Sequence, residues 1–297
     1  MSAGQVHDLG YKRYVGSRRD VGTRWRVIMR HQIANGWAGW WRFKIWLIAG
    51  SVTTAIIAGI LYFARAEVFR RVGAIGGVVL TYADGLLPDA PRWLSISAFM
   101  ISLTIGSTVV AGDIRSGAFT FYFARSVRPR DYVLGKLAGL AVLISFVMLA
   151  GPLVLAAVRL GLADDTDKLI EVLPILPKAI LIGVIGTLVY TAVPLGFSAL
   201  VANRRYAIGL WAIYYVPISW AVVGIGYAVN PDIAAIDLTT ALHAFSLHLF
   251  GLQTRTLRTE PSTIAALISL LGHVVLAIGV MMWRVRNAQR TGVGGAS

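Results

Sequence analysis

Six long runs of apolar residues alternate along this chain with shorter polar stretches. Each run has about 20 residues or more, the length that a helix needs to cross a hydrocarbon layer about 30 Å thick. The runs are continuous and lack the alternation of a β-barrel strand, so they predict an all-α integral membrane protein. The predicted transmembrane domain covers residues 44–283, with spans at 44–64, 93–111, 133–158, 176–201, 206–229 and 262–283.

Residues 72–87 form a shorter apolar run with four glycines and Asp84. A seventh span here would reverse the side of every later loop. Basic residues concentrate on the cytoplasmic side of membrane proteins, and with six spans 19 of the 28 Lys and Arg share one side. We therefore predict a multi-pass protein of the inner (plasma) membrane with both tails, 1–43 and 284–297, in the cytoplasm. The run at 72–87 is then an outer interfacial or half-inserted helix.

The segment before the first span predicts an amphipathic helix within residues 24–43. Apolar side chains recur there every three or four residues, at Trp25, Ile28, Met29, Ile33, Trp37, Trp40 and Trp41. The opposite face carries Arg26, Arg30, His31, Gln32 and Asn35. Because Trp favours the headgroup layer, we predict a helix in the inner interface. It is either a simple anchor or a lever on a cytoplasmic partner.

Composition agrees with a lipid environment. Hydrophobic residues make up 57% of the chain and charged residues only 14%, against roughly 25% charged in soluble domains. The net charge of +14 is spread over loops, where it sets topology and contacts anionic lipid, so nucleic-acid binding is not expected. The chain has no Cys, which excludes disulfides and thiol catalysis.

Motifs for catalysis or metal binding are not recognisable in the sequence. Gly135-Lys136 is followed by Leu137, so it does not complete a nucleotide-binding Walker A loop. His243 and His248 have no carboxylate at a ligand spacing, and mid-span His273 is expected to bond to a neighbouring helix. We expect no catalytic residue, no metal site and no enzyme activity of the chain alone.

A charged, aromatic segment, GDIRSGAFTFYFARSVRPRDYVLGK, occupies residues 112–136 between two spans. Pro129 can begin the next helix, which leaves room for a short helix with Asp113 near its N-terminus. Aromatic side chains that point several ways favour a second protein surface, such as a groove on a soluble partner. An ordinary interfacial loop is the alternative. The candidate contact residues are Asp113, Arg115, Phe119, Phe121, Tyr122, Arg125, Arg128 and Arg130.

This segment resembles the permease subunits of type 2 ATP-binding-cassette (ABC) exporters. The resemblance is carried by Asp113, Arg115 and Gly117, followed by ARSVRPRDYVLGK. The family usually has Glu at the position of Asp113, and commonly PVSR where this chain has SVRPR. The layout is also similar: an N-terminal amphipathic helix, six spans, a very short loop after span 4 and a hydrophobic, re-entrant outer region at 230–261.

The resemblance implies a dimer of permeases, with a second copy or a related chain, in which each permease binds a separate nucleotide-binding subunit. ATP and Mg²⁺ would bind to that partner, and no cofactor to this chain. The helix after span 2 would be the coupling helix. Spans 2 and 5 would line a path for the substrate, with contacts from Trp211, Tyr214, Tyr215 and Trp220, and their apolar walls favour an amphipathic or lipid-like cargo.

Three other functions are alternatives to an exporter permease. A secondary transporter or channel would need ionisable groups within the membrane or inverted repeats, and neither is visible. An intramembrane enzyme would need a catalytic pair at membrane depth, and His273 has no visible companion. A membrane anchor subunit of a complex stays open, because only a transport assay separates it from a permease.

Overall fold

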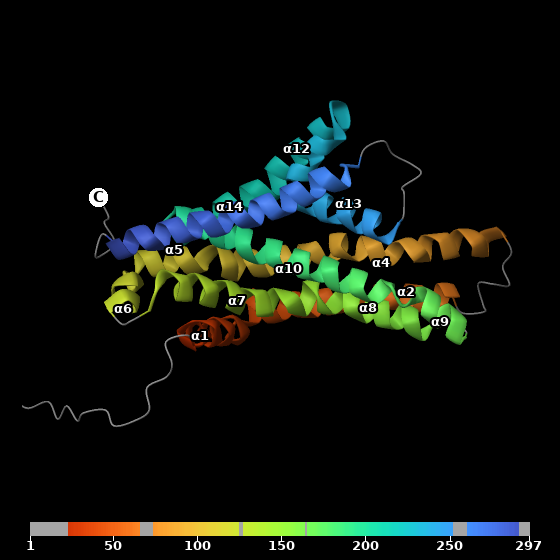
Figure 1. Cartoon of the computed structure of the whole chain (residues 1–297), viewed down its shortest axis with the longest axis horizontal. Coiled ribbons are helices and arrows are strands. Elements are labelled where there is room, and N and C mark those ends of the chain that lie inside the picture. The colour runs from red at the N-terminus through yellow and green to blue at the C-terminus, as the bar shows by residue number, and fades with distance from the viewer. Residues whose placement is uncertain (1–22, 66–73, 125–126, 164, 252–259, 291–297) are drawn as a thin grey trace, which may run out of the picture.

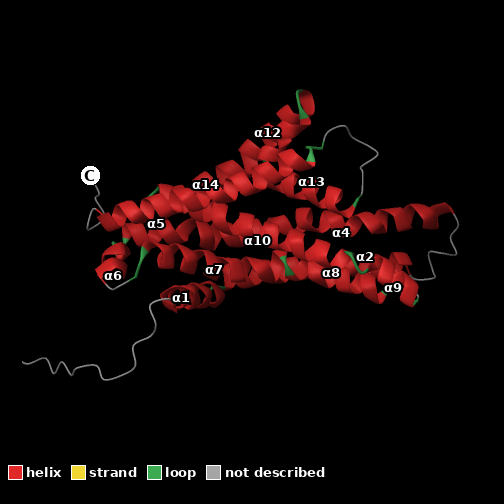
Figure 2. Ribbon diagram, viewed as in Figure 1, coloured by secondary structure: helices red, strands yellow, loops and turns green. Residues whose placement is uncertain are grey.

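The protein is a bundle of long helices. The computed structural model describes residues 23–65, 74–124, 127–163, 165–251 and 260–290. Within these ranges every regular element is a helix, as Figures 1 and 2 show. Six helical stretches are long and apolar enough to cross a membrane. The predicted all-α fold with six candidate spans is therefore confirmed.

The longer helices form the bundle, and π-helical or 3₁₀ segments interrupt or join them. The α-helices are α1 (Arg24–Ala38), α2 (Ile45–Arg65), α4 (Ala74–Ile101), α5 (Ser107–Arg115), α6 (Ala118–Ala124), α7 (Pro129–Met148), α8 (Ala150–Gly161), α9 (Thr166–Val172), α10 (Ile175–Leu200), α11 (Arg204–Ile213), α12 (Ser219–Ala228), α13 (Leu238–Phe250) and α14 (Thr263–Arg290). The other segments are η2 (Trp40–Lys44), η3 (Ser102–Gly106), η4 (Tyr214–Ile218) and η5 (Pro231–Ile236).

The six candidate spans each overlap one predicted run. They cover Trp40–Phe63, Gly85–Arg115, Pro129–Gly161, Thr166–Leu200, Arg204–Ala228 and Thr263–Arg290. Several extend well beyond the predicted limits, because a helix keeps its backbone hydrogen bonds into polar residues at the membrane surface. Apolar composition alone does not mark those ends.

The largest difference from the prediction concerns residues 72–87. The structure has no separate helix there: from Ala74 onward the chain forms α4, which runs unbroken to Ile101. Residues 72 and 73 lie outside the described residues. Pro88 and Pro91 lie inside α4 without ending it. In apolar surroundings an unpaired backbone group is costly, so the helix persists through glycines and prolines that would mark a boundary in water.

Helix α10 lies at the centre of the bundle, where it packs against α5, α7, α8 and α14 (Figure 1). Small residues allow this close packing. A Cβ added at Gly196 would lie 2.8 Å from the Cα of Ala277 in α14, closer than real Cβ contacts. The backbones of α10 and α14 therefore approach one another as they do at small-residue crossings in membranes.

Helix α1 packs across α7 through residues from both predicted faces. Ile28 of the predicted apolar stripe and Gln32 of the predicted polar face are 7% and 4% exposed. The assignment of Gln32 to the outer polar face was wrong. The reason is steric: a Cβ at Gly135 of α7 would lie 2.8 Å from the carbonyl oxygen of Trp25, so the two helices cross through small residues.

The region before the last span contains η5 and the 13-residue helix α13, which packs against α4 and α14. Helix α13 is too short to cross a bilayer. Asp237 begins it by accepting a hydrogen bond from the backbone N–H of Thr240 at 2.8 Å. Residues 252–259 lie outside the described residues. The expectation that this region dips into the outer leaflet stays a prediction.

Candidate functional site

The segment after the second span forms a short helix at one end of the bundle. Helix α5 ends at Arg115, Gly117 turns the chain with φ of +65°, and α6 follows (Figure 1). Glycine adopts this left-handed conformation without the steric cost of a Cβ. Pro129 then begins α7, and Asp131 Oδ2 accepts a hydrogen bond from the backbone N–H of Arg128 at 3.1 Å.

The prediction that Asp113 lies near the N-terminus of the short helix is wrong. Asp113 is in the last turn of α5, where its carboxylate contacts Lys136 of α7 at 2.8 Å. The hydroxyl of Tyr132 donates a hydrogen bond to the same carboxylate oxygen at 2.7 Å. Lys136 is only 4% exposed. A buried charge needs a partner, and these contacts tie the end of α5 to the beginning of α7.

Aromatic side chains attach α6 to this ion pair. Phe119 is 3% exposed and packs edge-on against the Tyr132 ring, with 5.2 Å between ring centroids. Tyr122 makes a similar contact with Tyr132 at 5.3 Å, and Phe123 stacks on Phe119. Edge-to-face contacts of this kind are favourable beyond the area that they bury. Through Tyr132, the packing of α6 and the Asp113–Lys136 pair form one assembly.

Tyr122 stays a neutral hydrogen-bonding group in this setting. Burial, with a further contribution from the negative charge of Asp113, raises the pKa of Tyr122 to about 12. The phenol is therefore protonated at any physiological pH. Together with Tyr132, it surrounds the carboxylate with neutral phenol groups that cannot add negative charge.

The outer side of α6 presents one large apolar side chain among basic ones. Phe121 is 76% exposed, in contrast to buried Phe119 two residues earlier. Arg115, Arg128 and Arg130 of the flanking helices are exposed too, and Arg125 lies outside the described residues. Aromatic residues and Arg are enriched among the residues that carry the binding energy of protein interfaces.

Helix α14 brings two arginines to this end of the bundle that are not among the predicted contact residues. Arg286 and Arg290 line a cavity of about 420 Å³ together with Arg128 and Arg130 at the start of α7. The C-terminal segment had been treated as a separate tail. Its four-residue spacing of basic side chains, on the same predicted side as the loop after span 2, was the signal that could have joined them.

The predicted path residues do not form one surface in this chain. Trp211 is completely buried, packs between Phe99 and Phe197, and donates its indole N–H to Ser102 Oγ at 3.0 Å. Trp220, in contrast, is 78% exposed. Trp211 therefore belongs to the buried core of the chain.

Two of the path residues, Tyr215 and Trp220, border a cavity of about 510 Å³. The hydroxyl of Tyr215 donates to Ser95 Oγ at 3.2 Å, which joins the cavity wall to α4. Tyr214 contacts His273 Nε2 of α14 at 2.7 Å. The expectation that His273 bonds to a neighbouring helix is thus confirmed, and the role of the tyrosines in a path stays a prediction.

The histidines of α13 lack the partners of a metal site. His243 pairs with Asp89 of α4 at 2.6 Å, a contact that joins residues far apart in the sequence. Among the described residues no group of three or more metal-ligating side chains occurs. The pair therefore joins α13 to α4.

No protein-family model matches this chain, and no curated protein matches it. The resemblance to exporter permeases therefore rests on the sequence pattern of residues 112–136 and on the layout of the spans. What the structure adds is a six-span helical architecture, with a short aromatic helix fastened to the end of two of the spans.

Proposed function

We propose that this chain is the transmembrane permease subunit of an ATP-driven exporter of the ABC type. In this proposal α6 is the coupling helix, and a separate nucleotide-binding subunit that holds ATP and Mg²⁺ docks on it. The permease works as a dimer, with a second copy or a related chain. The cargo is an amphipathic or lipid-like molecule.

One observation carries this proposal: α6 has a buried side fixed to two spans and an exposed side free to bind. Phe119 packs on Tyr132, which bonds to Asp113 of the neighbouring span, so a force on α6 reaches both α5 and α7. Phe121 faces outward at 76% exposure. An ordinary interfacial loop would need neither the ion pair beneath it nor an aromatic residue directed away from the bundle.

The arginines at this end of the bundle determine the kind of partner surface that would fit. Arg128 and Arg130 at the start of α7 and Arg286 and Arg290 at the end of α14 line one cavity, and α14 also contacts α6. A complementary partner presents an apolar groove for Phe121 and acidic residues at its edge. Charge complementarity of this sort directs the orientation and rate of docking more than the affinity.

The exposed fifth span supports the proposed dimer. Arg204–Ala228 is the least buried of the six candidate spans, and α12 projects from the bundle in Figure 1. The cavity beside Tyr215 and Trp220 opens on this side, between α4 and α12. A second permease against this face would complete a path whose walls come from both subunits. Movement of α5 and α7 with the partner would then change the access to it.

The test is copurification of the full-length protein with its ATPase, followed by transport. Wild-type protein extracted in mild detergent is expected to retain a subunit that hydrolyses MgATP, and Phe121→Ala to lose most of that subunit. Phe63→Ala is the matched control, because Phe63 is also largely exposed (62%) but lies near the far end of α2.

Two results would contradict the proposal. In the first, both Phe variants retain the ATPase equally well, so that Phe121 is not part of a docking surface. In the second, the purified chain alone carries cargo across a vesicle membrane at the rate reached with the ATPase and ATP.

A further inference from the structure

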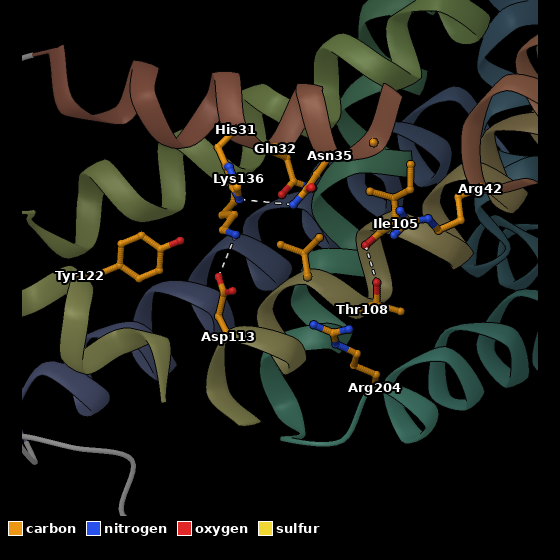
Figure 3. A pocket seen from close by; sticks show the side chains of 12 residues that line it. His31, Gln32, Asn35, Arg42, Ile105, Thr108, Asp113, Tyr122, Lys136 and Arg204 are labelled. Carbon is orange, nitrogen blue, oxygen red and sulfur yellow. Dashed lines mark hydrogen bonds and ion pairs between the residues drawn. The ribbon is translucent and has the colours of Figure 1, made fainter. Parts of the chain in front are cut away.

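A polar cavity of about 130 Å³ lies inside the same end of the bundle, beside the Asp113–Lys136 pair. Figure 3 shows Arg42, Arg204 and Lys136 approaching it from different helical segments. Arg42 belongs to η2, Arg204 begins α11, and Lys136 is in the second turn of α7. The side-chain amides of Gln32 and Asn35 line the cavity from α1.

The charges around this cavity do not cancel. Lys136 and Asp113 neutralise each other at 2.8 Å. Asp113 is the only acidic residue in the cavity wall, and within the part of the chain that the structure describes Arg42 and Arg204 form no ion pair. The cavity therefore has an excess of two positive charges, and the ligand that it fits is an anion with several acceptor oxygens.

The position of Arg204 depends on the residue beside Asp113. A Cβ added at Gly112 would lie 2.6 Å from both Nε and Nη2 of Arg204. Because Gly112 has no side chain, the guanidinium can lie directly on α5 at the cavity wall. There it forms part of the cavity wall. Arg is the side chain whose planar set of N–H donors matches phosphate oxygens.

The backbone conformation at Arg42 is a further, independent observation. Arg42 lies in the π-helical segment η2, which packs against another π-helical segment, η3. The hydroxyl of Thr104 in η3 donates to the carbonyl oxygen of Arg42 at 2.9 Å and fixes the two segments together. π-Helical turns are rare and occur frequently at functional sites, and here two of them adjoin one cavity.

The exposed tryptophans indicate the depth of the cavity in the membrane. Trp37, Trp40 and Trp41 are 43%, 54% and 73% exposed, and they closely precede Arg42 in the chain. Tryptophan prefers the layer of lipid headgroups. Arg42 and the cavity therefore lie at the level where lipid phosphates are concentrated. One water centre needs only about 10–15 Å³, so a phosphate group has room.

We propose that this cavity binds a phosphate-bearing anion, with the headgroup of an anionic lipid as its source in the membrane. The guanidinium groups of Arg42 and Arg204 would hold the phosphate, and the amides of Gln32 and Asn35 would donate further hydrogen bonds. This site is separate from the exposed side of α6, so the proposal does not depend on a docking partner. It assigns a lipid ligand to residues that the proposed transport function leaves unused.

The test compares lipid binding by full-length protein in nanodiscs of phosphatidylcholine with and without phosphatidylglycerol. The double variant Arg42→Gln/Arg204→Gln removes both guanidinium groups. Its charge-matched control is Lys44→Gln/Arg205→Gln, which changes the same number of cations at neighbouring positions outside the cavity wall. Native mass spectrometry measures the phosphatidylglycerol that each protein retains.

Wild type and the control are expected to prefer phosphatidylglycerol over phosphatidylcholine. The Arg42/Arg204 variant is expected to lose about a hundredfold in affinity for phosphatidylglycerol, because two charge-assisted hydrogen bonds disappear. If that variant does not fold, Arg204→Gln alone, at an exposed position, repeats the comparison with Arg205→Gln.

A second arm separates the two sources of phosphate. Inorganic phosphate is added to protein in phosphatidylcholine nanodiscs, and thermal unfolding is followed by tryptophan fluorescence. Stabilisation by phosphatidylglycerol alone supports a lipid site, and stabilisation by inorganic phosphate that requires Arg42 and Arg204 supports a site for free phosphate. The proposal is overturned if wild type responds to neither, or if both double variants lose the response equally.

Discussion

Removing one partner of the Asp113–Lys136 pair should destabilise the protein strongly, and removing both should not. The two charged atoms are 2.8 Å apart, which corresponds to an attraction of about 6 kcal/mol at an effective dielectric constant of 20. Desolvation of both groups offsets most of this attraction. A single variant, however, leaves the other charge buried without a partner, which costs about 3–5 kcal/mol.

The structure predicts an asymmetry between the two single variants. The side chain of Lys136 is 5% exposed and that of Asp113 is 19% exposed. Asp113→Asn leaves the deeper charge unpaired, so its cost should be at the upper end, about 5 kcal/mol. Lys136→Met leaves the shallower carboxylate, which keeps the hydrogen bond from Tyr132 and has Arg204 nearby, so about 3 kcal/mol is expected. The double variant should cost well below the sum of the two.

Equilibrium unfolding of the purified protein in mixed dodecylmaltoside–SDS micelles gives these free energies, with tryptophan fluorescence as the signal. Arg130→Met, an exposed cation at the same end, is the control and should change stability by less than about 0.5 kcal/mol. The reasoning is refuted if the single variants cost no more than this control. Strict additivity of the two substitutions would refute it as well, because it would mean that the side chains do not interact.

Three further predictions concern packing, topology and ionisation. Gly196→Ala should lower the free energy of unfolding by about 1–3 kcal/mol in the same assay, because the added methyl meets the backbone of α14. Gly279→Ala is the control, because its methyl meets nothing within 4 Å, and it should be neutral. Equal costs would contradict a close approach of α10 and α14 at Gly196. Because the chain has no native Cys, single variants Ser116→Cys, next to α6, and Thr166→Cys, at the start of α9, report topology, since α6 and α9 lie at opposite ends of the bundle (Figure 1). An impermeant maleimide should label only Thr166→Cys in intact cells, and labelling of Ser116→Cys would place α6 outside. The raised pKa of Tyr122 favours its neutral form, so the stability that it contributes is present below pH 10 and lost as the pH rises through about 12. Absorbance titration of wild type minus Tyr122→Phe should show a midpoint near 12, and a midpoint at 10 would show that the phenol is not buried.

The spans could be predicted because each is determined by the residues of its own segment. A run of apolar residues long enough to cross a bilayer must form a helix, whatever the rest of the chain does. The ends of the helices were harder, since hydrogen bonding continues beyond the apolar run. At residues 72–87 the glycines and Asp84 predicted a separate element, but the backbone continues through Pro88 into the second span.

The site was predictable as a segment but not as a set of contacts. Residues 112–136 stood out by charge and aromatic content alone. The pairing of Asp113 with Lys136 depends on how α5 and α7 pack against one another. The spacing of residues along the sequence does not predict that packing. The face of Gln32 was wrong for a related reason. Helical periodicity sorts residues by polarity, whereas α1 meets α7 where Gly135 and Gly139 of α7 leave room for Ile28 and Gln32.

The ion pair beneath α6 is better understood as an orienting device than as a source of stability. A well-packed apolar pair of similar volume often stabilises a protein as much as a buried salt bridge does. Such a pair would not fix a direction, whereas the carboxylate of Asp113 must lie within bonding distance of both Lys136 and the Tyr132 hydroxyl. Because Phe119 and Tyr122 pack on Tyr132, that geometry also determines which way α6 faces. The Asp113–Lys136 double variant should therefore remain folded while its α6 loses a defined orientation, so that partner docking weakens more than stability does.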